Sequence, residues 1–272
     1  ASLAKDSTWL TAHMDRTHRM YERSKNHPAI VIWSLGNEAG NGINFERTYD
    51  WLKSVEKTRP VQYERAELNY NTDIYCRMYR GVDEIKAYVA KKDIYRPFIL
   101  CEYLHAMGNS CGGLKEYWDV FESEPMAQGG NVWDWVDQSF REIDKSGKWY
   151  WTYGGDYGPQ GIPSFGNFCC NGLVGADREP HPHLLEVKKV YQYIQFIAKD
   201  LGKGIISIKN RYDFTNLDEY AFMWEIYKNG EKISTGDFNV DLKPHEEKEI
   251  RLSLPVIPED GNEYFLNLYV HT

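Results

Sequence analysis

The first half of the chain alternates between short apolar runs and longer amphipathic segments, with few residues between them. The runs end near positions 34, 64, 76, 101 and 135, and helices are expected over 7–23, 45–58, 82–91 and 112–121. This alternation of strand and helix is typical of a parallel sheet covered by helices. We count about five such strands. A closed (β/α)8 barrel needs eight, so the pattern predicts a partial TIM barrel that begins with a helix.

Two of the apolar runs lead directly to a glutamate. Residues 30–35 continue through Gly36 and Asn37 to Glu38, and residues 98–101 are followed by Glu102. In a parallel α/β fold the carboxyl ends of the strands carry the chemistry. Either acid alone would be interpreted as a surface carboxylate at the start of a loop. Together they fit glycoside hydrolysis, in which one acid protonates the leaving oxygen and the other attacks the sugar or activates water.

The remaining sequence divides into a loop-rich segment, a helix and a β-rich region. Residues 139–182 contain several glycines and predict a long irregular stretch, which is more often functional than accidental. A final helix is expected over 183–197. From 198 onward the runs are short, β-rich and separated by turns, with a hairpin signal at Asn229-Gly230. The predicted domains are therefore 1–197, a partial barrel, and 198–272, an immunoglobulin-like β-sandwich.

Composition and charge indicate which binding partners are not expected for this chain. The chain has 272 residues, a net charge of −8 and no basic run, which argues against nucleic-acid binding. No apolar stretch approaches the roughly 20 residues of a membrane span, so no membrane contact is expected. The five cysteines lack CxxC spacing, which favours free thiols over disulfides or a zinc site. No signal peptide is present, but the chain opens on Ala1, so the compartment stays open between cytoplasm and periplasm.

The segments around both glutamates resemble the two active-site signatures of bacterial-type glycoside hydrolase family 2 β-galactosidases. Residues 34–38 read Ser-Leu-Gly-Asn-Glu, and residues 101–110 read Cys-Glu-Tyr-Leu-His-Ala-Met-Gly-Asn-Ser. The likeness continues through 78–79, 133–138, 153–156, 168–174 and 176–182, and so covers 1–197. Glucuronidase and mannosidase relatives share the Asn-Glu pair but usually lack the His-Ala-Met-Gly-Asn-Ser continuation. The resemblance implies the second half of the catalytic (β/α)8 barrel, followed by the β-sandwich that succeeds it in that family.

The resemblance also implies roles for individual residues. Glu102 would be the nucleophile and Glu38 the acid/base of a double-displacement mechanism that releases terminal β-D-galactose with retention. Four residues would contact the substrate: Asn37, Tyr79, His105 and Trp133. A purely structural role stays the alternative for Tyr79 and His105, and Trp135 is expected to pack in the core.

Two metals are implied by the same resemblance. Glu38 would be a Mg²⁺ ligand, together with a Glu and a His from an earlier strand that this chain lacks, so the Mg²⁺ site is incomplete here. His13 and His18 lie in the first predicted helix and are expected to face solvent. The carbonyl of Phe168 and the side chain of Asn171 match part of a Na⁺ site.

The resemblance covers only part of the family's architecture. The sugar-binding domain, the linking sandwich, the first barrel strands and the C-terminal domain have no counterpart here. We therefore expect little or no activity from the isolated chain, and we expect its uncovered strand edges to self-associate or pair with missing segments. The longer parent is expected to be a homo-oligomer that acts on a galactoside. Two alternatives stay open: another specificity on this scaffold, such as β-glucuronidase, and a non-catalytic carbohydrate-binding or structural module.

Overall fold

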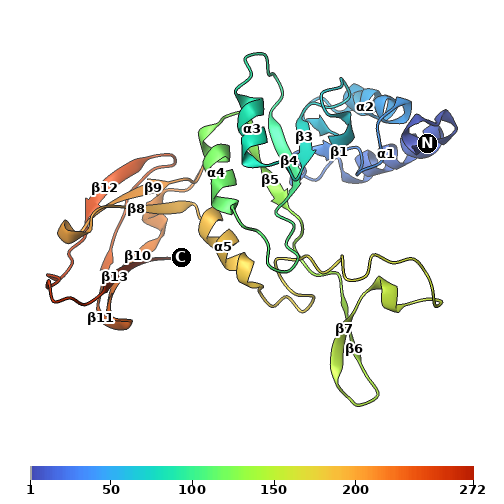
Figure 1. Cartoon of the computed structure of the whole chain (residues 1–272). Helices are drawn as coiled ribbons and strands as arrows, with labels where there is room; N and C mark the ends of the chain where they lie inside the picture. The colour runs from blue at the N-terminus through green and yellow to red at the C-terminus, as the bar shows by residue number, and fades with distance from the viewer. Residues whose placement is uncertain (1) are drawn as a thin grey trace. The chain divides into compact units, whose positions relative to one another are not determined.

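The computed structural model describes residues 2–272, which fall into two compact units, one ending at Val190 and one beginning at Tyr191 (Figure 1). The first unit is α/β. Its strands are β1 (Trp33–Ser34), β2 (Val61–Gln62), β3 (Tyr75–Met78), β4 (Phe98–Tyr103), β5 (Ala127–Val132), β6 (Phe140–Ile143) and β7 (Trp149–Thr152). Its helices are α1 (Leu10–Ser24), α2 (Ile43–Val55), α3 (Val82–Val89), α4 (Leu114–Ser123) and α5 (Pro182–Tyr191), with short 3₁₀ turns at Leu3–Lys5, Ser7–Trp9, Glu64–Ala66 and Gly154–Asp156.

Strands β1 to β5 are the five strands expected from the apolar runs, and all their pairings are parallel. They form two sheets, β1-β2 and β3-β4-β5, which do not close into a barrel within the described residues. The segment before β3 reaches the first sheet, because the N–H of Asp73 donates to the carbonyl of Val61 at 2.7 Å. The carboxyl ends of the strands carry Glu38, Tyr79 and Glu102 or lead into them.

Helices cover these strands through aromatic contacts. Trp33 of β1 and Val61 of β2 share a core with Leu52 of α2, against which α1 residues also pack. Tyr88 of α3 lies 5.7 Å from Phe98 of β4, measured between ring centroids. This packing explains why the amphipathic segments became helices, since each buries its apolar face on a strand.

The loop-rich segment contains an antiparallel hairpin, β6-β7, so regular structure interrupts the irregular stretch expected over 139–182. The turn is built on Asp144, whose carboxylate accepts the N–H groups of Ser146 at 2.8 Å and Lys148 at 3.0 Å. Gly147 completes it with φ 86°. Every residue of β6 is exposed, so the strand lacks the alternation of buried and exposed positions that identifies a strand in a sequence.

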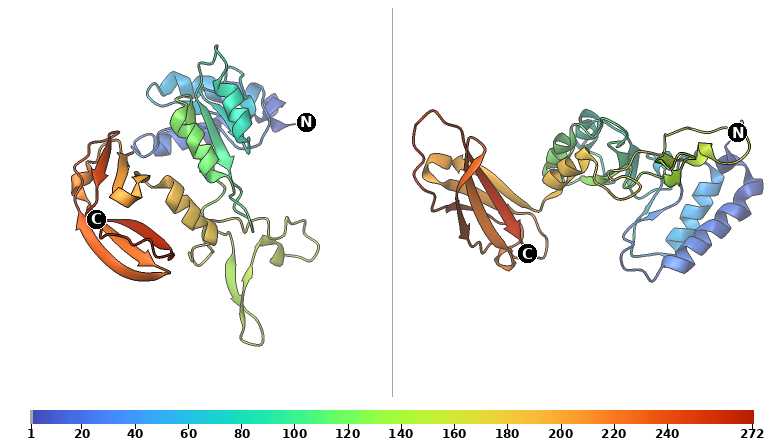
Figure 2. Two further views of the ribbon diagram at one scale, coloured as in Figure 1. Left: turned by 60° about the vertical axis from the view of Figure 1, so that its left-hand side comes forward. Right: turned by 90° about the horizontal axis from the view of Figure 1, so that it is seen from below.

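The second unit is antiparallel and β-rich. Its strands are β8 (Ile194–Asp200), β9 (Ile205–Asn210), β10 (Ala221–Lys228), β11 (Glu231–Phe238), β12 (Glu247–Arg251) and β13 (Tyr264–His271), with 3₁₀ turns at Leu201–Lys203 and Leu217–Glu219. They form two sheets, in the orders β11-β10-β13 and β12-β9-β8. The unit is drawn in orange to dark red in Figure 2. The predicted hairpin joins β10 to β11 through Asn229 (φ 48°) and Gly230 (φ 88°), the two positive angles of a type I′ turn.

One core joins the two sheets of the second unit. Ile206 and Ile208 of β9 pack with Phe222, Trp224 and Ile226 of β10. Burial of both inner faces is therefore what makes these strands a two-layer structure.

The last predicted helix is too long. Helix α5 ends at Tyr191, and residues 194–197, expected to be helical, belong to β8. Ile194 is 7% exposed and packs in the β-rich core, and Phe196 pairs with Ile208 of β9. Antiparallel pairing thus overrides the helical spacing at this junction, and the sequence-based division at 197/198 falls inside β8.

Two further features concern membrane-spanning helices and the state of the cysteines. Within residues 2–272 no helix combines the length and apolarity needed to cross a bilayer. All five cysteines are free thiols, and Cys76 and Cys111 are buried.

Candidate active site

Three strand ends of the α/β unit share an unusual backbone conformation. Glu38 after β1, Tyr79 after β3 and Leu104 after β4 have φ of 50°, 52° and 51°, in the left-handed region that non-glycine residues seldom adopt. Such residues persist only where surrounding contacts hold them, and they cluster at functional sites. The carboxyl ends of these strands are therefore where a site is to be sought.

Glu102 lies near the end of β4 and is tied to the neighbouring strand β3 through Tyr79. The Tyr79 hydroxyl donates to Oε2 of Glu102 at 2.9 Å, and the Tyr79 N–H donates to the Glu102 carbonyl, also at 2.9 Å. Burial raises the pKa of Tyr79, and the bond to Glu102 and the charges of Glu102 and Glu38 raise it further. Tyr79 therefore holds the Glu102 carboxylate and the end of β4 through two hydrogen bonds.

Glu38 follows β1, and its surroundings come from the residues after β2. Its side chain is 56% exposed, and Oε1 lies 3.3 Å from a guanidinium nitrogen of Arg65. Its N–H donates to Oε1 of Glu64, a residue only 7% exposed. Burial raises the pKa of Glu64, while the bond from Glu38 and the charge of Arg65 oppose that rise. Two acids and one arginine thus meet at this corner.

His105 and Asn171 come together although they are far apart in sequence. Nδ2 of Asn171 lies 3.2 Å from Nε2 of His105 and donates to the carbonyl of Phe168 at 3.2 Å. The rings of Phe168 and His105 stack, with centroids 5.0 Å apart. Oδ1 of Asn171 is buried and has no hydrogen-bond partner in the part of the chain that is described. The predicted substrate histidine and the predicted Na⁺ ligands therefore form one cluster.

The tryptophans follow β5. The Trp133 N–H donates to Tyr103 at 3.0 Å and its carbonyl accepts from Ala106 at 2.8 Å, which places it beside the end of β4. Its side chain is 37% exposed, and the peptide bond to Asp134 is cis. Trp135 is 60% exposed, so the expectation that it packs in the core is wrong, because most of its surface faces solvent. Asn37 is exposed beside Glu38.

His13 and His18 do not face solvent as expected. The His13 ring meets Phe45 edge-on at 5.0 Å, and the His18 ring lies 3.8 Å from Trp51, between centroids. Both are partly buried because α2 covers that face of α1. Among the described residues, no three His, Cys, Asp or Glu side chains converge as metal ligands would.

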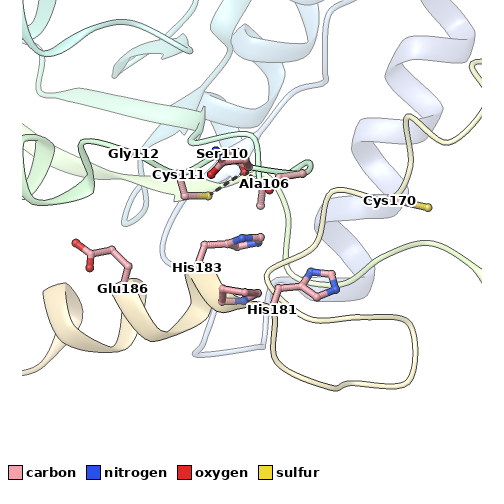
Figure 3. A pocket seen from close by; sticks show the side chains of 11 residues that line it. Ala106, Ser110, Cys111, Gly112, Cys170, His181, His183 and Glu186 are labelled. Atoms are coloured by element: carbon pink, nitrogen blue, oxygen red, sulfur yellow. Dashed lines mark hydrogen bonds between the residues drawn. The ribbon is translucent and has the colours of Figure 1, made fainter.

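A cavity of about 680 Å³ is lined by Ala106 and Cys170, the residues next in sequence to His105 and Asn171 (Figure 3). It is lined by the glycine-rich loop before α4 and by residues at the start of α5, including His183 and Glu186. Nδ1 of His181 and Nε2 of His183 lie 2.9 and 3.2 Å from the carbonyl of Gly172. A carbonyl only accepts, so both nitrogens carry a proton. The two histidines therefore support the backbone next to Asn171.

Sequence reasoning missed Glu64 and Arg65. The signal was weak, because the short run before Glu64, Val61-Gln62-Tyr63, contains a polar residue. The sequence pattern extends the strand to position 64, whereas β2 ends at Gln62 and Glu64 opens a 3₁₀ turn.

Two family models match the chain. Residues 1–196 match the TIM barrel domain of the glycosyl hydrolases family 2, and residues 206–272 match domain 4 of beta-galactosidase.

Curated relatives match nearly the whole chain. "Beta-galactosidase 2" of Enterobacter cloacae is 41% identical over 280 residues, and the beta-galactosidase of Yersinia enterocolitica serotype O:8 / biotype 1B is 43% identical over 282 residues. Each alignment covers 98% of this chain but 27% of the relative. The chain thus spans about a quarter of the length of these proteins.

A solved structure is also similar. Bacteroides uniformis beta-glucuronidase 2, covalently bound to cyclophellitol-6-carboxylate aziridine, matches with a TM-score of 0.48 and 15% identity, over 96% of this chain and 36% of that one.

Proposed function

Because the chain belongs to glycosyl hydrolase family 2, we propose that it carries the catalytic residues of a retaining β-galactosidase. The reaction is the release of terminal β-D-galactose from a β-galactoside. The observation that carries the proposal is the pair of hydrogen bonds by which Tyr79 fixes Glu102 at the end of β4, while Glu38 follows β1, another parallel strand of the same unit. Two strand-end carboxylates around one site are the arrangement that glycoside hydrolysis requires.

The proposed steps assign a role to each carboxylate. Glu102 attacks the anomeric carbon, and Glu38 protonates the departing aglycone oxygen, leaving a galactosyl ester on Glu102. Glu38 then takes a proton from water, which hydrolyses the ester with overall retention. The mechanism requires the two carboxyl groups to be about 5–5.5 Å apart when substrate is bound. Tyr79 orients the attacking oxygen of Glu102 through its hydroxyl.

The other residues bind the sugar in this proposal. Asn37 and His105 offer hydrogen bonds to hydroxyl groups, and Trp133 offers an apolar wall against the C–H face of galactose. The contact of Asn171 with His105 fixes the orientation of the imidazole. These roles rest on the placement of the residues at the carboxyl ends of β1, β4 and β5.

The implied metals fit this chain to different extents. The buried Oδ1 of Asn171 has no partner among the described residues, and the carbonyl of Phe168 lies 3.2 Å from Nδ2 of the same amide. Oxygen donors of this kind suit Na⁺, whose charge would orient a sugar hydroxyl. For Mg²⁺ the described residues offer Glu38, whose carboxylate faces Arg65 and does not join two further ligands. The set does not fit Mg²⁺ on its own, and no step is assigned to that ion.

Two finer aspects of the architecture belong to the same proposal. We assign β1 to β5 to the second half of the family's barrel, and the β-rich unit to an immunoglobulin-like sandwich. The open edges of β1 and β5 would pair with segments that the longer relatives carry, and the isolated chain would therefore have little or no turnover. The parent protein would be a homo-oligomer.

The test compares this chain with a chimera in which it replaces the matching segment of the Enterobacter cloacae enzyme. Both are assayed on aryl β-D-galactosides, each beside its Glu102→Gln variant, after thermal unfolding shows that they are folded. We expect turnover by the chimera that the Glu102→Gln change removes, and little from the chain alone. Hydrolysis of β-glucuronides instead would establish the glucuronidase alternative. Galactose binding unaffected by Glu102→Gln, without turnover, would establish a binding module.

A further inference from the structure

We infer that Glu64 is a positioning residue for Glu38, an assignment that rests on the proposed acid/base function of Glu38. Glu64 opens the 3₁₀ turn that follows β2, the strand that pairs with β1. Its Oε1 accepts the N–H of Glu38. Glu64 is only 7% exposed, so its carboxylate lies beneath the Asn37-Glu38 turn and does not face solvent.

The backbone of Glu38 needs such a contact. Its φ of 50° lies in the left-handed region, which costs a residue with a Cβ and is held only where the surroundings determine it. A hydrogen bond from an N–H to a carboxylate is charge-assisted and among the stronger ones in proteins. The bond to Glu64 therefore fixes the backbone N–H of Glu38.

Neighbouring contacts hold the rest of the turn but do not touch Glu38. The hydroxyl of Tyr63 donates to the carbonyl of Gly40, and Nδ2 of Asn71 donates to Oδ1 of Asn41 at 2.9 Å. Tyr63 and Asn71 are fully buried. Residues after β2 thus hold residues 38–41 through hydrogen bonds, and among these Glu64 is the residue that binds the backbone of Glu38.

Arg65 completes the corner from the solvent side. Its Nη2 lies 3.3 Å from Oε1 of Glu38, and its Nε lies 3.3 Å from Oε2 of Glu64. One guanidinium therefore offsets the repulsion between two carboxylates. The half-exposed position of Arg65 makes its contribution the weaker of the two, because water screens it.

The first test measures hydrogen exchange of backbone amides in the chain as it stands. The reference is the Leu35 amide, which donates to Gln62 at 3.1 Å in the same pair of strands. In Glu64→Ala we expect the Glu38 amide to exchange at least about tenfold faster, with Leu35 unchanged. In Glu64→Gln the amide oxygen still accepts, so protection of Glu38 is retained.

Three results would overturn the assignment: an unchanged Glu38 amide in Glu64→Ala, equal acceleration of Leu35, or loss of Glu38 protection in a folded Glu64→Gln chain. If the alanine variant does not fold, protection of the Glu38 amide in the Glu64→Gln chain decides whether the assignment holds.

The second test uses the chimera and the leaving group of the substrate. A misplaced general acid harms substrates with poor leaving groups, whereas an activated aryl group departs without protonation. In Glu64→Ala we expect kcat/KM to fall at least about tenfold for phenyl β-galactoside and by less than about threefold for the dinitrophenyl substrate. Equal losses on both substrates would contradict a positioning role. Absence of turnover in the folded wild-type chimera would refute the proposed function, while the exchange experiment would still decide whether Glu64 holds Glu38.

Discussion

The hydroxyl of Tyr79 donates a 2.9 Å hydrogen bond to Oε2 of Glu102, and the backbone N–H of the same tyrosine donates to the Glu102 carbonyl. A single residue thus fixes both the strand end and the carboxylate of the proposed nucleophile. The left-handed backbone of Tyr79, with φ 52°, is what turns its ring toward β4 while its N–H stays in the strand pairing.

Removal of that hydroxyl tests its role. In the chimera, Tyr79→Phe should lower kcat on aryl β-galactosides by about 10- to 100-fold, since a hydrogen bond to a charged group contributes about 1.5–3 kcal/mol. Tyr95→Phe is the matched control, because Tyr95 is 76% exposed. Steady-state kinetics of both variants give the comparison. A Tyr79→Phe rate equal to that of the control would show that the phenol does not support the nucleophile.

The pairing of Glu56 predicts the acid sensitivity of the α/β unit. Burial alone would raise the pKa of Glu56, but hydrogen bonds from Thr58, Trp33 and Arg59 lower it from 4.5 to about 2. Because the folded pKa is depressed, this stabilisation is fully present above pH 4.5 and is lost as the pH falls toward 2. Urea unfolding followed by circular dichroism should show that loss across this window.

Glu56→Gln removes the negative charge of this side chain but keeps its size, so it tests the contribution of the charge to stability. The variant should be about 2 kcal/mol less stable at pH 7, because the charged hydrogen bonds to Trp33 and Arg59 are weakened. It should also lose less stability than the wild type between pH 4.5 and 2. Glu116→Gln in α4, at an exposed position, is the control. Identical pH profiles for wild type and Glu56→Gln would contradict the account.

The unpartnered, buried Oδ1 of Asn171 predicts stabilisation of the chain by Na⁺, which can be measured without turnover. Replacing choline chloride with NaCl at constant ionic strength should raise the melting temperature of the wild-type chain. A concentration ten times the dissociation constant would add about 1.4 kcal/mol. Asn171→Ala should abolish this difference. Equal responses of wild type and variant would exclude Asn171 as a ligand.

The close approach of Trp224 to Gly236 predicts that the β-rich unit does not tolerate a side chain at position 236. A Cβ at this position would lie 2.5 Å from the ring of Trp224, which faces it across β10 and β11. Gly236→Ala should therefore destabilise the unit by about 1–3 kcal/mol. At Gly202 the nearest atom, a carboxylate oxygen of Asp200, would be 3.6 Å away, so Gly202→Ala is the control. Calorimetric unfolding measures the stability of both variants. Equal stabilities would show that the Trp224 ring moves aside without cost.

The parallel strands could be predicted from sequence because each is an apolar run between turn-forming residues and an amphipathic segment. The β6-β7 hairpin could not, since its first strand is wholly exposed and its pairing depends on the Asp144 turn. The junction at Ile194 was misassigned because helical spacing cannot show that a strand from the next unit will pair with it.

The site shows the same division. Glu38 and Glu102 could be selected as candidates from their position after apolar runs, and their roles stay predictions, whereas selecting Glu64 required knowledge of where β2 ends. His13 and His18 were misplaced because periodicity identifies residues that share a helix face without showing which face α2 covers. The meeting of His105 and Asn171 depends on chain folding between distant segments, which no local pattern encodes.

Covalent trapping tests the central claim most directly. The chimera is incubated with an activated 2-deoxy-2-fluoro-β-D-galactoside, whose glycosyl ester hydrolyses slowly, then digested and analysed by peptide mass spectrometry. The account predicts a fluorogalactosyl ester on Glu102, absent from Glu102→Gln. A label on Glu38 or on another residue, or none on a folded chimera that hydrolyses galactosides, would contradict the assignment of Glu102 as the nucleophile.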